Sequence, residues 1–544
     1  MLIPTAPALA RVRDAYRRIA AADRPEVWID LRPQDGPEAE AAAVDARVAA
    51  GEHLPLAGLV LAVKGNIDVA GLPTTAGCPS YAYRPAADAP AVARLRAAGA
   101  VVLGTTNLDQ FATGLVGTRS PYGAVRGAVD PTRISGGSSS GSAVAVALGL
   151  VDLALGTDTA GSGRVPAALN GVVGLKGAPG AVPTAGVVPA CRSLDCVSVF
   201  ARTTELALAA HRLMADPAPQ PARAPGPWRV AVPRPEQLGE LAEGWSAAFR
   251  RAAAAFPAAR ELDLTPFSTV AAMLYDGAFA AERYDAVGEF LARGGPDLDP
   301  TVRRIVLAAG ELPAHRLFRD RARLADLREA ALAELGDADA LLLPTTTGHP
   351  TLAEVAADPV GSNARLGRFT NSANLLGLCA LAVPAGEVDG LPFGVMLVGR
   401  PHTEDRLAAI AAQLTDPPVP LAVFGAHLTG QPLNGHLLAL GAHLAGAVST
   451  AAEYRLYALP TDPPKPGLVA VADGGAAIGG ELWLLPPAGL ARLLATLPAP
   501  MLLGPVRLAD GRTVPGFRCD PAGAAGAPDI THHGSWPAYL AARK

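Results

Sequence analysis

Residues 136–177 read GGSSSGSAVAVALGLVDLALGTDTAGSGRVPAALNGVVGLKG, with two glycine- and serine-rich loops around a strongly apolar run. A flexible linker would lack that apolar run, so this composition is typical of backbone held closely around a small ligand. The first loop, 136–142, leads into a helix, and we expect its hydroxyls to cap that helix. The second loop, 156–163, precedes Pro166, which suits the first turn of another helix. Two helix N-termini would then face one spot and favour negative charge there.

Three residues, one before this stretch and two within it, indicate its chemistry. Lys64 precedes Ser138 by 74 positions, and Ser162 follows Ser138 by 24. These residues and spacings resemble the amidase signature family, whose members carry a Ser–cis-Ser–Lys triad. The resemblance implies that Ser162 is the nucleophile, Ser138 the cis-serine that relays protons, and Lys64 the base. One departure is that Ala160 and Gly161 precede Ser162 where the family usually has two glycines.

A lysine base needs an unusual environment. A serine hydroxyl is a poor nucleophile at neutral pH and requires a base within hydrogen-bond reach, yet none of the ten histidines lies in the motif. With an ordinary pKa of about 10.4, only about one lysine in a few thousand is neutral at pH 7. Residues 59–63 read as a buried strand that ends at Lys64, and burial lowers the pKa of an amine. We therefore expect Lys64 to be buried.

The second loop also supplies candidate groups for an oxyanion hole. The expected donors are the backbone N–H groups of Thr159, Ala160, Gly161 and Ser162. Asp158 is expected to orient this loop through hydrogen bonds to its backbone. Arg164 either pairs with Asp158 or lies on the surface.

Composition limits the remaining function classes. The chain has 544 residues, half of them apolar, with a formal net charge of -4 and a pI near 6.2. This charge gives no basic footprint for nucleic acid or an anionic membrane, and no apolar run is long enough to span a bilayer. The five cysteines are scattered without a C-x-x-C pair, so neither disulfides nor a zinc site are expected. We expect a cytoplasmic protein that needs no metal and no organic cofactor.

The pattern before the motif alternates strands and helices. A strand at 59–63, a helix at 89–98 and a strand at 100–104 predict an α/β sheet with helices outside. The segments 105–109 and 114–122 are then loops near strand ends, where ligands bind. Further buried strands are predicted at 341–344, 381–384 and 393–399, before a closing helix at 406–414. The resemblance implies an amidase-signature core, a mixed central sheet covered by helices, over residues 1–415.

A second resemblance concerns Tyr275 and Arg283. Residues 274–284, LYDGAFAAERY, resemble the allophanate hydrolases, in which a tyrosine and an arginine eight residues later hold the substrate's carboxylate. On one helix, this spacing would let both side chains reach one cavity, and arginine suits a carboxylate because its planar fork contacts both oxygens. The alternative is a helix-surface arginine beside a packed tyrosine.

The end of the chain differs in composition. A proline-rich break at 415–420 precedes a tail, 423–544, whose short strands at 454–459 and 481–485 suggest a small α+β barrel. Residues 423–430 resemble the glycine-containing loop of γ-glutamylcyclotransferase-like domains, with Phe424 where tyrosine is usual. Its candidate catalytic residues are His427, His532 and His533. A lone histidine is more often structural, so the tail either processes a product or stabilises an oligomer.

Together, the resemblances imply a serine amidohydrolase that deaminates allophanate (N-carboxyurea) to N-carboxycarbamate and ammonia. Carbon dioxide and further ammonia would follow, as in urea or s-triazine nitrogen catabolism. The chain lacks a biotin-acceptor Met-Lys-Met, so a separate urea carboxylase is the expected partner if urea is the source. A homodimer is also expected. Two alternatives remain: an amidase acting on another small carboxylated amide, and a non-catalytic assembly subunit.

Overall fold

The computed structural model describes residues 6–220, 227–415, 419–440 and 442–543. The chain divides into two compact units, Met1–Ala411 and Ala412–Lys544. Residues 221–226 of the proline-rich stretch at 217–227, and 416–418 of the break at 415–420, lie outside the described residues.

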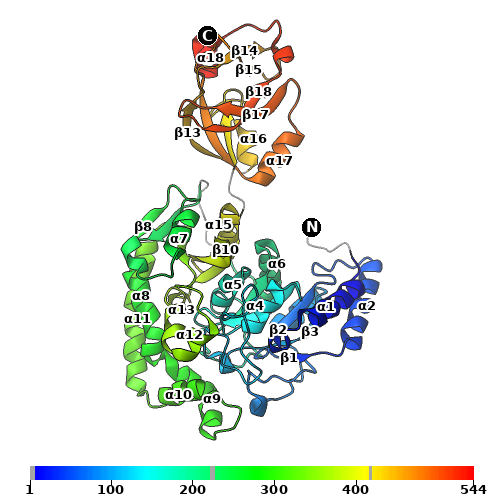
Figure 1. Ribbon diagram of the computed structural model, residues 1–544, viewed down its shortest axis with the longest axis vertical. Coiled ribbons are helices and arrows are strands. Elements are labelled where there is room, and N and C mark those ends of the chain that lie inside the picture. Colours follow the sequence, from blue (N-terminus) through cyan, green and yellow to red (C-terminus); the bar gives the residue numbers. More distant parts are fainter. Residues whose placement is uncertain (1–5, 221–226, 416–418, 441, 544) are drawn as a thin grey trace. The chain divides into compact units, whose positions relative to one another are not determined.

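The first unit is built on an eleven-stranded mixed sheet with the order β1-β3-β2-β4-β6-β5-β10-β11-β9-β7-β8 (Figure 1). Its strands are β1 Trp28–Leu31, β2 Val60–Lys64, β3 Val101–Thr106, β4 Leu153–Asp158, β5 Val173–Lys176, β6 Cys196–Ala201, β7 Val230–Pro233, β8 Arg260–Leu262, β9 Ala340–Pro344, β10 Cys379–Val388 and β11 Leu391–Gly399. The strands predicted from 59–63, 100–104, 341–344, 381–384 and 393–399 are all present. The expected mixed sheet is confirmed.

The helices of this unit are α1 Ala8–Ala22, α2 Asp35–Ala49, α3 Pro90–Ala97, α4 Ser140–Ala147, α5 Val165–Leu169, α6 Thr204–Met214, α7 Trp245–Ala253, α8 Thr265–Asp276, α9 Ala281–Ala292, α10 Pro300–Ala309, α11 Ala314–Leu335, α12 Leu352–Ala357, α13 Gly361–Leu366, α14 Asn371–Leu375 and α15 Glu404–Thr415. The predicted helices at 89–98 and 406–414 correspond to α3 and α15.

Parallel strands bring the two motif regions to one edge of the sheet. β2 pairs in parallel with β4, with Val63 opposite Leu155. Both strands are buried along their whole length, as their continuous apolar sequences predict. Their carboxyl ends therefore lie side by side, so Lys64 at the end of β2 lies at the same edge as the loop after β4.

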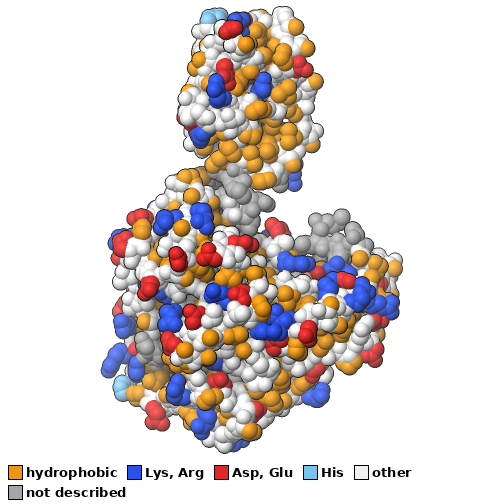
Figure 2. All heavy atoms as spheres, in the orientation of Figure 1, with side chains coloured by type: hydrophobic (Ala, Val, Ile, Leu, Met, Phe, Trp, Pro, Cys, Tyr) orange, Lys and Arg blue, Asp and Glu red, His pale blue; other side chains and the backbone are white. Residues whose placement is uncertain are grey.

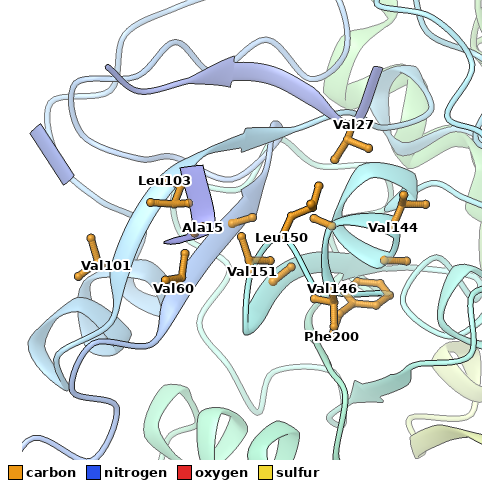
Figure 3. Packing of buried hydrophobic residues seen from close by; sticks show 14 of the residues in the cluster. Ala15, Val27, Val60, Val101, Leu103, Val144, Val146, Leu150, Val151 and Phe200 are labelled. Atoms are coloured by element: carbon orange, nitrogen blue, oxygen red, sulfur yellow. The ribbon is translucent and has the colours of Figure 1, made fainter. Parts of the chain in front are cut away.

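Helix α4 is buried against this sheet. Figure 3 shows Val144, Val146, Leu150 and Val151 gathered with Phe200 of β6 around the inner strands. A helix composed of small apolar residues and serine can pack this closely, and residues 140–146 are all buried. The core thus fixes the position of the loop that begins the helix.

The serine hydroxyls at the start of α4 do not cap it, contrary to expectation. Ser139 is the N-cap residue but makes no side-chain cap hydrogen bond. Instead, Ser139 Oγ donates to Thr157 O (3.1 Å) and Ser142 Oγ donates to Leu155 O (2.8 Å). Because α4 lies directly on β4, these hydroxyls satisfy strand carbonyls and join the first loop to the second.

The second unit is a smaller α+β domain, also as expected. Its elements are β12 Val419–Val423, α16 Asn434–Ala439, β13 His443–Ser449, β14 Tyr454–Leu459, β15 Lys465–Ala470, β16 Gly479–Leu485, α17 Pro487–Ala495, β17 Met501–Arg507, β18 Thr513–Cys519 and α18 Trp536–Ala541. Five strands form a mixed sheet in the order β13-β16-β12-β18-β17, and β14 pairs with β15. A bridge between Thr450 and Leu508 joins the two edges, which gives the sheet a barrel-like curl.

The charged side chains are mixed on the surface. On the face of the first unit that Figure 2 shows, Lys and Arg side chains are interspersed with Asp and Glu. Among the described residues, no helix is both long and apolar enough to cross a membrane.

Candidate active site

Lys64 is the centre of the site at the end of β2. Its side chain is fully buried, and Nζ donates hydrogen bonds to Ser138 Oγ (2.8 Å) and to Thr157 Oγ1 (2.7 Å). Burial lowers the pKa of Lys64 to about 7, although Asp109, Asp158 and Asp195 oppose this shift. A substantial fraction of this lysine is therefore neutral near pH 7, as a general base requires.

Ser138 belongs to a loop that several backbone hydrogen bonds hold. The peptide bond between Gly137 and Ser138 is cis. Asp109 N–H donates to Ser138 O (3.1 Å), and Gly137 N–H donates to Leu115 O (2.8 Å). The segment 109–115 is thus joined directly to the Ser138 loop.

Ser162 lies in the loop between β4 and α5 and is only 3% exposed. The two loops are packed together: a Cβ at Gly136 would lie 3.1 Å from the Cα of Pro166, at the start of α5. Pro166 is in the first turn of α5, as predicted. The fold therefore brings Lys64, Ser138 and the Ser162 loop to one place.

An ion pair, Asp158 with Arg164, anchors the Ser162 loop. The Arg164 guanidinium donates to both carboxylate oxygens of Asp158 (2.9 Å each), and both side chains are fully buried. The surface alternative for Arg164 is therefore wrong. Burial alone would raise the pKa of Asp158, but the Arg164 guanidinium holds it below its usual value. The same carboxylate accepts from Gly161 N–H and Gly163 N–H (2.9 Å each) and so orients the loop.

The hydrogen bond from Gly161 N–H to the Asp158 carboxylate changes the expected set of oxyanion donors. Gly161 N–H is committed to Asp158, because the carboxylate caps the turn. By contrast, the N–H groups of Thr159, Ala160 and Ser162 have no acceptor within the described part of the chain. These three donors are available to a bound oxyanion.

Three residues that sequence reasoning missed also hold this loop. Thr370 Oγ1 donates to Ala160 O (2.6 Å), and Asn374 Nδ2 donates to Asp158 O (2.8 Å). Asp195 accepts from Thr159 Oγ1 (2.5 Å), and burial raises the pKa of this carboxyl. They lie far from the motif in sequence, and no local pattern marks them.

Tyr275 and Arg283 do not share one helix, contrary to expectation. α8 ends at Asp276, and α9 begins at Ala281. Gly277 separates them in an extended conformation (φ -93°, ψ 172°), and a Cβ there would lie 2.3 Å from Met273 O. The Tyr275 side chain lies outside the described residues. Arg283 is 3% exposed, so it is not a surface arginine, and it donates to Thr113 Oγ1 (3.1 Å).

The second unit has a cavity of about 210 Å³ at the loop that follows β12. Its polar lining includes His427, His436 and Lys465, and much of the rest is apolar, including Phe424 and Phe517. The His427 ring stacks on Phe517 with 4.6 Å between ring centroids, and its Nε2 is buried without a partner. Burial lowers the pKa of His427 to about 4, so it is neutral at pH 7.

His532 and His533 lie elsewhere in the second unit. They belong to a short 3₁₀ turn, Thr531–His533, and neither lines the cavity. The His533 ring contacts Tyr539 with 5.4 Å between ring centroids. The structure therefore separates His427 from the other two candidates.

The site contains side-chain and backbone groups suited to acyl transfer. Among the described residues, no cluster of three or more His, Cys, Asp or Glu side chains could hold a metal ion. The five cysteines are buried and unpaired.

Comparisons with known proteins agree with this architecture. The profile of the amidase family matches residues 10–408, and that of the allophanate hydrolase C-terminal domain matches residues 419–541. A urea amidolyase of Lachancea kluyveri is 40% identical over 90% of this chain, and the chain spans 30% of that protein's length. A 2-amino-5-chloromuconic acid deaminase of Comamonas testosteroni is 36% identical over 68% of the chain and 84% of its own length.

A solved structure covers both units. The allophanate hydrolase of Kluyveromyces lactis is 37% identical, with a TM-score of 0.71, over 99% of this chain and 98% of its own. The chain therefore belongs to the amidase family and, within it, to the allophanate hydrolases.

Proposed function

We propose that this chain hydrolyses allophanate to N-carboxycarbamate and ammonia. The observation that carries the proposal is the fully buried Lys64 bonded to Ser138, beside the Ser162 loop. The similarity to the K. lactis allophanate hydrolase over 99% of the chain supports the choice of substrate.

In the first half of the reaction, Ser162 Oγ attacks the carbonyl carbon that carries the terminal NH₂ group. Its proton passes to Ser138, whose own proton goes to the neutral amine of Lys64. The N–H groups of Thr159, Ala160 and Ser162 stabilise the oxyanion. The proton then returns through Ser138 to the leaving nitrogen, the C–N bond breaks, and ammonia leaves an acylated Ser162.

In the second half, water adds to the acyl carbon and gives its proton to the same relay. The ester bond breaks, Ser162 recovers its proton, and a second carboxylate forms on the product. One allophanate monoanion and one water thus give one N-carboxycarbamate dianion and one ammonium ion.

The carboxylate of allophanate distinguishes it from neutral amides. We assign this group to Arg283, with Tyr275 as the partner that the family resemblance implies. Arg283 is buried, so its guanidinium meets a carboxylate in a poorly solvated environment, where such a pair is strong.

The cavity around His427 is our proposed site for the loss of carbon dioxide from the product. It is largely apolar, and His427, His436 and Lys465 are among the polar groups that line it and could bind an anion. An apolar site weakens the hydration of a carboxylate and so favours its departure as neutral carbon dioxide. Of the three histidines predicted from the sequence, His427, His532 and His533, only His427 lines the cavity, so we prefer it. As the C–N bond to that carboxylate breaks, the nitrogen takes up a proton from water, which gives carbamate. Carbamate takes up a further proton and breaks down to ammonia and a second carbon dioxide.

A separate urea carboxylase would supply allophanate from urea, and we propose a homodimer as the working assembly. The test of function is ammonia release by the purified chain from allophanate, malonamate and biuret, the last being the neutral isostere of allophanate. We expect allophanate to have the highest kcat/KM. A higher value for malonamate would instead indicate an amidase for another carboxylated amide. A folded chain that hydrolyses none of the three would be an assembly subunit.

A further inference from the structure

The second residue after Lys64, Asn66, is also buried beside the amine of that lysine. Asn66 is 1% exposed, and its side-chain Nδ2 donates to Thr157 Oγ1 (3.2 Å). The same hydroxyl oxygen accepts from Lys64 Nζ (2.7 Å). Asn66 and Lys64 therefore share one acceptor, and Thr157, which is 2% exposed, joins them at a place with little access to water.

A backbone carbonyl sets the orientation of the Asn66 amide. Val188 O lies 3.5 Å from Nδ2, and a carbonyl oxygen can only accept, so the N–H side of the amide faces Val188 and Thr157. The other end, Asn66 Oδ1, is buried and has no hydrogen-bond partner in the described part of the chain. An unsatisfied buried acceptor costs stability, so the donor is kept at this position although the acceptor is left alone.

The hydrogen bonds around Lys64 Nζ suit a neutral amine better than an ammonium ion. An ammonium ion has three N–H groups, and the described residues offer it two acceptors, Ser138 Oγ (2.8 Å) and Thr157 Oγ1. Asn66 already donates to the second of these. A neutral amine has two N–H groups and a lone pair, and the lone pair can accept from the Ser138 hydroxyl, as the proton relay requires.

The charged groups near Lys64 favour the ammonium ion instead. They are the carboxylates of Asp109, which follows β3, Asp158, which ends β4, and Asp195, which precedes β6. Helix α4, which packs on the same strands, carries no titratable side chain. Burial and a short supply of acceptors must therefore hold the amine unprotonated against three carboxylates.

We propose that Asn66 is a positioning residue that acts through Thr157, and that its donation to the Thr157 hydroxyl keeps the Lys64 amine unprotonated and turned toward Ser138. This inference rests on the proposed function, in which Lys64 is the base, and deepens it. Asn66 touches neither the substrate nor the moving proton. Its N–H group competes with the lysine for one acceptor, and this competition weakens the hydrogen bonding of the ammonium form.

A purely structural role for Asn66 predicts a different result. The backbone already joins the end of β2 to the segment at 188, because Val188 N–H donates to Asn66 O (2.9 Å). Asn66→Leu keeps this bond and fills a similar space, but it removes the amide donor. If the side chain only fills space, the apolar leucine leaves the pKa of Lys64 unchanged or lowers it further. If the donor acts as proposed, the pKa of Lys64 rises.

The ionisation of Lys64 can be measured directly, because the chain has only four lysines, at positions 64, 176, 465 and 544. Lysine labelled with ¹³C at Cε then gives four NMR signals in the full-length chain, and Lys64→Arg identifies the signal of Lys64. The chemical shift of this signal is followed between about pH 5.5 and pH 9. The titration needs neither substrate nor turnover.

We expect Asn66→Leu to raise the midpoint of the Lys64 titration by about 0.5 to 1 pH unit, the size of one competing hydrogen bond. The acid limb of kcat/KM for allophanate should move with it, a loss of about three- to tenfold near pH 6. In the Thr157→Val background, Asn66→Leu should move the midpoint by less than about 0.2 pH unit, because the acceptor through which Asn66 acts is gone.

Asn107→Leu is the matched control. Asn107 follows β3, the parallel neighbour of β2, and is fully buried. Its Nδ2 donates to Glu26 O and Gly123 O (3.0 Å each) and not to a group bonded to Lys64. This substitution removes a buried amide of the same kind and should leave the midpoint of the Lys64 titration unchanged.

An unchanged or lower midpoint in Asn66→Leu would overturn the proposal, and so would an equal rise in the Thr157→Val background or in Asn107→Leu. If Asn66→Leu does not fold, judged by thermal denaturation, Asn66→Ala is titrated with the same expectation. Failure of both to fold would show that the amide serves the fold, which also overturns the proposal. If the midpoint depends on Asn66 but allophanate is not hydrolysed, the role of Asn66 stands and the proposed function falls.

Discussion

Lys64 Nζ lies 2.8 Å from Ser138 Oγ, and neither side chain is exposed to solvent. Water does not compete for this contact, and the same burial that protects it lowers the pKa of the lysine to about 7. The strand end thus both places the amine and keeps a substantial fraction of it unprotonated at neutral pH. The pH dependence of the reaction follows from this relationship.

We expect kcat/KM for allophanate to rise with pH and level off above about 7. Below that pH, Lys64 is protonated and cannot accept the proton of Ser138, so the rate should fall about tenfold per pH unit. The measurement is a profile of initial ammonia release between pH 5.5 and about 9, within the range where the protein stays folded.

Lys64→Arg is the matched control for this profile. Arginine stays protonated across the range, so this variant should be inactive at every pH. A wild-type profile that is flat between pH 5.5 and 8 would contradict the role of Lys64 as the base.

The Asp158 and Arg164 pair should contribute to stability as well as to activity. Asp158→Asn leaves the fully buried Arg164 without its counter-ion, and we expect a loss of about 3–5 kcal/mol in the free energy of unfolding. Urea denaturation measures this loss. The double variant Asp158→Asn with Arg164→Met should regain part of the lost free energy of unfolding. If it regains none, the loss comes mainly from the hydrogen bonds that Asp158 accepts from Gly161 and Gly163, and not from the unpaired charge.

Arg283→Gln should discriminate between charged and neutral substrates. Removing the guanidinium leaves the carboxylate of allophanate unpaired in a buried site, which costs about 2–5 kcal/mol in transition-state binding. Biuret, without that carboxylate, should lose much less. The comparison uses kcat/KM for both compounds, and an equal loss on each would show that Arg283 is structural.

Much of the first unit could be predicted because its signals are local. The apolar run before Lys64 predicts the buried strand β2, which is present. The spacing from Lys64 to Ser138 and Ser162 predicts a catalytic triad, and this stays a prediction. The parallel pairing of β2 and β4 then brings the motif regions together. Continuous apolar strands and glycine-rich loops are visible in the sequence itself.

The parts of the fold and site that the sequence does not predict depend on contacts between segments that are far apart in the sequence. Thr370, Asn374 and Asp195 reach the Ser162 loop from parts of the chain whose sequences carry no sign of this role. The prediction that one helix carries both Tyr275 and Arg283 is wrong for a local reason. Gly277 ends α8 where a side chain would meet a backbone carbonyl, and an eight-residue spacing alone does not reveal that break.

The cavity of the second unit gives a prediction for the later step. His427→Ala should leave the first release of ammonia near the wild-type rate, because His427 lies outside the amidase unit. Release of carbon dioxide should lag, and N-carboxycarbamate should accumulate transiently. Simultaneous recording of ammonia and carbon dioxide tests this prediction, with His533→Ala as the control outside the cavity. An unchanged time course with a lower melting temperature would show that the cavity is architectural.

The most direct test of the central claim is ammonia release from allophanate by Ser162→Ala, compared with the wild-type chain at equal concentration. If Ser162 is the nucleophile, the variant should remain folded and lose nearly all turnover, and adding Lys64→Ala should cause little further loss because the two residues act as one unit. Activity above about a tenth of the wild-type value in the Ser162→Ala chain would contradict the account.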